Sequence, residues 1–131
     1  MGTDLAADLS RHCDLIEECY EFMLAYAGQG LPGPGGDGQI RDFLTRAAAA
    51  LEALEAAIPA VEPYLAFREV TARDARDSLA AVKLVLAQPA ISSQLIDNLN
   101  ASIHLRALLT DLFLIDEILK NRARVTSSPS S

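Results

Sequence analysis

The chain has 131 residues, half of them hydrophobic, and its 18 acidic residues against 11 basic ones give a formal net charge of −7. This length fits one domain, which can bury about two-thirds of its unfolded surface. The acidic balance argues against nucleic acid and an anionic membrane surface as partners, because both attract clustered Lys and Arg. With no signal-peptide pattern and no long apolar run, we expect a cytoplasmic protein.

The first predicted helix covers residues 3–27, with Thr3 as its N-cap and Gly28 as its C-cap. Cys13 and Cys19 lie about 9 Å apart along such a helix, beyond the reach of a disulfide, so we expect two free thiols. Apolar residues recur there at steps of four and three, the period of one helix face. The residues on this face are Leu5, Leu9, His12, Ile16, Cys19, Met23 and Tyr26.

The following segment, residues 28–38, is rich in glycine and proline and contains the pattern G-x-G-x-x-G over residues 28–33. That pattern binds dinucleotides when it joins a strand to a helix, so that the helix N-terminus meets the pyrophosphate. Here it follows a predicted helix at the C-terminal end, where the helix dipole repels phosphate. The segment is therefore predicted to be a connecting loop, with Asp37 as the N-cap of the next helix and no nucleotide cofactor.

Two further helices are predicted over residues 39–60 and 63–87. The first is rich in alanine and leucine, which have high helix propensity. Pro59 and Pro63 interrupt the apolar pattern, because a proline inside a helix removes a hydrogen bond and clashes with the preceding turn. Pro63 is expected to be the first residue of the next helix.

The fourth predicted helix covers residues 91–121, and its second half is apolar around more than half of its circumference. Residues 123–131 lack periodicity and are predicted to form a disordered tail. Since no pattern of period two occurs, the sequence predicts an all-α fold. The expected architecture is a single domain over residues 1–122, an antiparallel, up-down-up-down four-helix bundle with the Gly/Pro-rich loop between its first two helices.

Part of the broad apolar arc of the fourth helix is expected to be a subunit interface, because large exposed apolar patches usually mark contacts. A two-fold homodimer is the default closed assembly, and a different protein partner is the other expectation. The predicted interface residues are Leu105, Leu109, Phe113, Leu114, Ile96 and Ile103.

The two histidines, His12 and His104, are the natural starting points for a search for chemistry. Neither stands in a Glu-x-x-His or H-E-x-x-H motif, so His12, Cys13 and His104 remain candidate metal ligands without a supporting motif. No catalytic residue, metal or cofactor is predicted. We expect a non-enzymatic bundle that acts by protein–protein association, as scaffold or accessory. The alternative is an internal pocket for a metal or small ligand near His12, Cys13, Cys19 and Met23, with a catalytic role.

Overall fold

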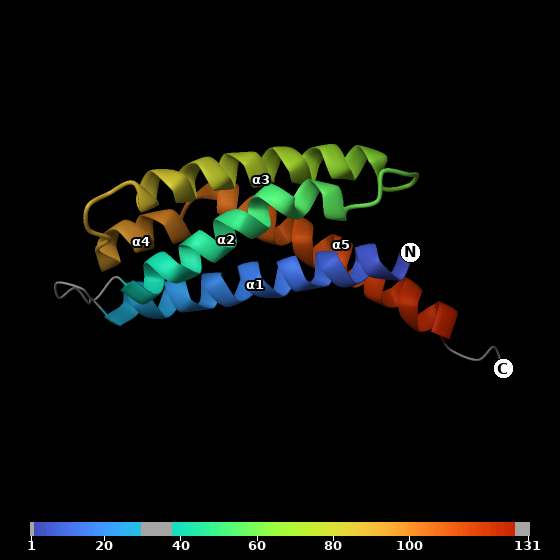
Figure 1. Cartoon of the computed structure of the whole chain (residues 1–131), viewed down its shortest axis with the longest axis horizontal. Helices are drawn as coiled ribbons and strands as arrows, with labels where there is room; N and C mark the ends of the chain where they lie inside the picture. Colours follow the sequence, from blue (N-terminus) through green and yellow to red (C-terminus); the bar gives the residue numbers. More distant parts are fainter. Residues whose placement is uncertain (1, 30–37, 128–131) are drawn as a thin grey trace.

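The computed structural model describes residues 2–29 and 38–127, and within them the chain is helical and contains no strand. The prediction of an all-α fold is thus confirmed. Side chains are described for residues 7–28 and 38–121. The five helices are α1 (Gly2–Gln29), α2 (Gly38–Ala57), α3 (Leu65–Leu86), α4 (Ser93–Asn100) and α5 (Ile103–Ser127) (Figure 1).

The single helix predicted over residues 91–121 is wrong, because the chain there forms two helices, α4 and α5. α4 ends at its C-cap, Ala101, and α5 begins at Ile103. Asn98, Asn100 and Ser102 surround this break, and such side chains compete with the helical backbone for hydrogen bonds. Apolar residues keep the helical period across the break, so the periodicity of the sequence did not indicate that the helix ends there.

The predicted helix ends also need correction. α1 begins at Gly2, ahead of the predicted cap Thr3, and continues through Gly28 to Gln29, so Gly28 is a helical residue and not a left-handed C-cap. Pro63 precedes α3, whose N-cap is Tyr64. The predicted loop residues 30–37, with Asp37, lie outside the described residues.

The prediction of a disordered tail over residues 123–131 is wrong for residues 123–127. α5 extends to Ser127 and therefore includes residues 123–127, which were predicted to be disordered. Residues 128–131 lie outside the described part of the chain.

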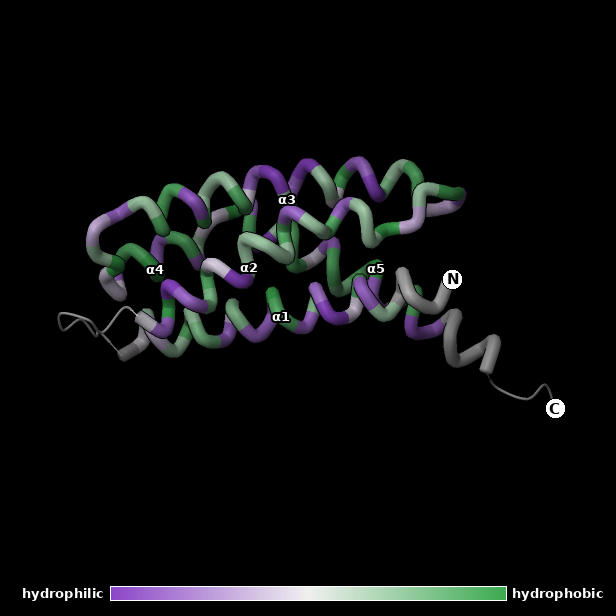
Figure 2. The backbone as a smooth tube through the Cα atoms, viewed as in Figure 1, coloured by the Kyte–Doolittle hydropathy of each residue, from purple (hydrophilic) through white to green (hydrophobic). Residues whose placement is uncertain are grey.

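Each helix contributes buried apolar residues to one core, and hydrophobic and hydrophilic stretches alternate along α1 and α3 (Figure 2). α1 packs against α2, α4 and α5, whereas α3 packs against α2, α5 and α4. On α1 the core position expected for His12 belongs to Cys13, which is fully buried, while His12 is half-buried at the edge. Between Leu9 and Ile16, either His12 or Cys13 fits a pattern with steps of three and four residues. The less polar thiol of Cys13 takes the buried position.

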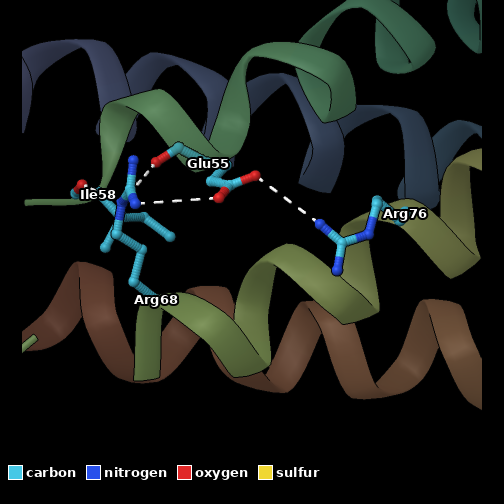
Figure 3. A network of polar contacts seen from close by, with 4 residues as sticks. All are labelled: Glu55, Ile58, Arg68 and Arg76. Atoms are coloured by element: carbon cyan, nitrogen blue, oxygen red, sulfur yellow. Dashed lines mark hydrogen bonds and ion pairs between the residues drawn. The ribbon is translucent and has the colours of Figure 1, made fainter. Parts of the chain in front are cut away.

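Two arginines link α2 and α3 by hydrogen bonds to carbonyl oxygens at the ends of these helices. The Arg68 Nε donates hydrogen bonds to the carbonyl oxygens of Glu55 (3.1 Å) and Ile58 (3.0 Å) at the end of α2 (Figure 3). The Glu55 carboxylate in turn lies 3.8 Å from guanidinium nitrogens of both Arg68 and Arg76. The last carbonyls of a helix have no partner within it and favour a nearby cation, so Arg68 caps α2 from α3.

A second arginine, on α2, caps the C-terminal end of α3. Arg41, near the start of α2, donates hydrogen bonds to the carbonyl oxygens of Leu86 (3.2 Å) and Gln88 (2.7 Å) at the end of α3. Each helix of this pair therefore caps the C-terminal end of the other. These reciprocal caps require α2 and α3 to run in opposite directions, and they fix the register of the pair.

Candidate functional site

The predicted interface residues divide into two groups in the structure. Ile96, Leu105 and Leu109 are buried in the chain's own core, which removes them from the surface available to a partner. Phe113 and Leu114 are exposed by 54% and 52%. The sequence indicated the width of the apolar arc, but which part of it is covered depends on where α1 and α3 pack.

Four exposed apolar side chains lie on α5, and we call them the α5 apolar face: Ile103, Phe113, Leu114 and Ile118. Ile118 was missing from the predicted interface, although it follows Leu114 by one helical turn and so lies beside it. Nine large apolar side chains are exposed in the described part of the chain, and α5 carries these four of them. α5 thus carries the largest share of these exposed side chains, and α3 carries three of them, Leu65, Val70 and Leu84.

A groove runs between α1 and α5, with a volume of about 230 Å³. Its apolar lining comes from Tyr20 and Leu24 on α1 and from Leu109 and Phe113 on α5. Leu109 is buried at its base, whereas Leu24 and Phe113 are about half-exposed. Tyr20 and Leu24 were not predicted as site residues, because the sequence does not tell which helix lies beside α5.

The α1 side of this groove is acidic, with Glu17 and Glu21 in its lining. Partial burial raises the pKa of Glu17, and the negative charges of Asp14 and Asp116 raise it further. Within the described residues neither Glu17 nor Glu21 has an ion-pair partner, while Lys120 pairs with Asp116 at 2.9 Å. The groove therefore combines an apolar floor with carboxylates that form no ion pair within the described residues.

The candidate metal ligands do not converge. Cys13 and Cys19 are free and buried, and burial raises the pKa of each thiol to about 12. His12 has a pKa lowered by partial burial and by the charge of Arg11. His104 faces a different helix, with its Nδ1 3.8 Å from the carboxylate of Asp77 on α3. The described part of the chain contains no group of three His, Cys, Asp or Glu side chains placed to hold a metal ion.

The cavity beside Cys19 and Met23 is too small for the internal ligand considered above. Its volume is about 10 Å³, and its lining is almost entirely apolar. A single water molecule needs about 10–15 Å³ of such space, whereas pockets for small molecules usually measure about 300–1,000 Å³. The thiols are unreactive as well, because the nucleophile and metal ligand is the thiolate, which a pKa of about 12 disfavours at neutral pH.

Asp74 on α3 and Asp111 on α5 form a pair of neighbouring carboxyl groups, which was not predicted from the sequence. Asp111 is only 8% exposed, and its pKa is raised to about 7 by burial first and then by the hydrogen bond and negative charge of Asp74. The buried Oδ2 of Asp111 has no hydrogen-bond partner among the described residues, which also disfavours the charged carboxylate. Asp111 therefore holds a proton at a pH where ordinary aspartates have lost theirs.

Two buried hydroxyl groups flank this pair on α3. Thr71 and Ser78 share the face of Asp74, at steps of three and four residues. Both side chains are buried, and their oxygens have no hydrogen-bond partner among the described residues. The recurrence of polar residues at this spacing was the only signal in the sequence that this contact is polar.

Comparisons of the chain with known protein families, curated proteins and solved structures give no match. Among the described helices, none combines the length and the apolar character needed to cross a membrane. The assignment of function therefore rests on the surface of the molecule, above all on α5 and the groove beside it.

Proposed function

We propose that the chain acts by binding protein rather than by catalysis, and that the α5 apolar face is its contact surface. The observation that carries the proposal is the exposure of Ile103, Phe113, Leu114 and Ile118 on one helix. Burying a large apolar side chain contributes about 1.5–3 kcal/mol relative to full exposure, so a half-exposed face of this kind gains free energy when a partner covers it. Contiguous apolar patches on soluble proteins usually mark such contacts.

The first form of association to consider is a two-fold homodimer. In such a dimer the same patch of both copies meets itself. Leu114 and Ile118 suit this contact, because they are aliphatic, exposed and one helical turn apart. Ile103 lies about three turns before Leu114 on the same helix, and the exposed Arg106 and Thr110 lie between them, so Ile103 is a separate apolar position.

We further infer that α4 and α5 together take the fourth position of an up-down-up-down bundle, in which the Gly/Pro-rich segment between Gln29 and Gly38 joins α1 to α2. The packing of α4 and α5 against α1 and α3 supports this architecture. The two free, buried cysteines support a cytoplasmic location, where thiols are kept reduced.

Light scattering after size exclusion tests the homodimer. We expect a mass of twice the 14.0 kDa chain at micromolar concentration, and Leu114→Glu should shift it to that of one chain. Leu84→Glu is the matched control, because Leu84 is 66% exposed on a different helix, α3. A wild-type mass of one chain, or equal effects of the two variants, would remove the homodimer from the proposal.

A further inference from the structure

The groove between α1 and α5 has the shape of a receptor for a helix. Tyr20 and Leu24 are one turn apart on α1, and Leu109 and Phe113 are one turn apart on α5, so each wall is a short ridge of large side chains. Its volume of about 230 Å³ is below that of usual small-molecule pockets. Space between two ridges is suited to the side chains of a third helix, which anchor at steps of three and four residues.

The charge along this groove restricts what can occupy it. Asp14, Glu17 and Glu21 follow one another on α1 at steps of three and four, and so form an acidic row. Lys120, whose charge acts on Glu17, pairs with Asp116 at 2.9 Å. A second copy docking by the same groove would bring both acidic rows into one interface, and like charges so placed cost several kcal/mol.

We infer that this groove binds an amphipathic helix of another protein, one that carries lysine or arginine beside its apolar stripe. The inference rests on the proposed function, and it names the partner's chemistry. The apolar stripe lies between Leu24 and Phe113 and covers Leu109, while the basic side chains pair with Glu17 and Glu21. Charges at the rim of a contact act mainly on the association rate and are screened by salt, so binding weakens as ionic strength rises.

Two synthetic helical peptides provide the test. Both carry leucine at positions i, i+3, i+4 and i+7, but one has lysine and the other glutamate at the polar positions. Fluorescence anisotropy of each labelled peptide is measured as the full chain is added. The lysine peptide should bind, with an affinity that falls as salt is raised, and the glutamate peptide should not. Absence of binding by the lysine peptide, or equal binding of both peptides, overturns the inference.

Matched variants locate the binding on the protein. The double change Glu17→Gln and Glu21→Gln should weaken binding of the lysine peptide about tenfold, since the half-buried Glu17 and the exposed Glu21 contribute about 1–1.5 kcal/mol together. The control pair Glu62→Gln and Glu69→Gln removes the same charge from exposed positions elsewhere and should change the affinity less than twofold. Phe113→Ala should also weaken binding. Equal losses in both glutamate pairs would reveal attraction to net charge alone and overturn the inference.

Light scattering separates this inference from the proposed function. A wild-type dimer that fails to bind the lysine peptide refutes the groove but leaves association intact. A single chain that binds the peptide supports the groove without a homodimer. If Phe113→Ala converts a dimer to single chains while Leu114→Glu does not, the groove is occupied by a second copy and the inference is wrong.

Discussion

Replacement of Asp111 by asparagine should stabilise the fold at high pH and leave it unchanged at low pH. Asparagine keeps the shape and a hydrogen-bond donor toward Asp74 but carries no charge at any pH. In the folded chain the pKa of Asp111 is about 7, against an ordinary value of 3.8. The native protein therefore retains a proton that the unfolded chain releases from about pH 4 upward.

The direction of the effect follows from this difference in proton binding. Because the folded state binds more protons between pH 4 and pH 7, the free energy of unfolding falls as pH rises through that window and levels off above it. One pKa unit corresponds to about 1.4 kcal/mol, so the shift sets a ceiling of about 4 kcal/mol. Residual contact with water and rotation of Asp74 toward solvent relieve part of this cost. We expect Asp111→Asn to gain about 1–3 kcal/mol at pH 8.

Urea unfolding followed by circular dichroism at pH 4 and pH 8 measures this gain. Comparing the variant with the wild type at each pH cancels the titration of the other carboxyl groups. Asp97→Asn, at an exposed position on α4, is the control and should change the free energy of unfolding by less than about 0.5 kcal/mol at either pH. A gain from Asp111→Asn that is equal at both pH values, or a loss at pH 8, would refute the raised pKa of Asp111.

Three further predictions concern the packing that holds the helices. Arg68→Met should lower the free energy of unfolding by about 2–3 kcal/mol, because it leaves the end of α2 uncapped, whereas Arg76→Met removes only an exposed ion pair and should cost less than about 0.5 kcal/mol. Equal costs in urea unfolding would contradict the cap. Tyr26→Phe should cost about 1 kcal/mol through its lost hydrogen bond to the Ile91 carbonyl (2.5 Å), and an unchanged unfolding midpoint would exclude that contribution. Cys13 and Cys19 should react with a thiol reagent slowly at pH 8 in the native protein and rapidly in denaturant, and prompt native reaction would contradict their burial.

The helices could be predicted from the sequence where the deciding interactions are local. The step of four and three along residues 39–60 corresponds closely to α2, because helix periodicity is a property of the segment itself. The break after Asn100 was missed because Leu99 and Ile103 keep the apolar period, while several residues of low propensity end the helix. Periodicity reports which face is apolar and does not report where the helix stops.

The candidate site depends on neighbours in space and was only half predictable. Leu109 and Phe113 are both apolar and one turn apart on α5, yet one is buried and the other is 54% exposed. The difference arises from how the other helices pack against α5, which no local pattern encodes. The acidic row on α1 was visible as a charged face, but its place along an apolar groove appears only when α1 and α5 meet.

The contact of α5 with α3 differs in kind from the contact of α2 with α3. α2 and α3 are joined by reciprocal arginine caps at both ends, whereas the contact of α3 with α5 contains the Asp74–Asp111 pair and two buried hydroxyl groups without partners. Each buried polar group without a partner costs about 1–3 kcal/mol, so the two hydroxyl groups lower the net stabilisation from the contact of α3 with α5. A partner that covers Phe113, as proposed above, would add apolar contacts to α5.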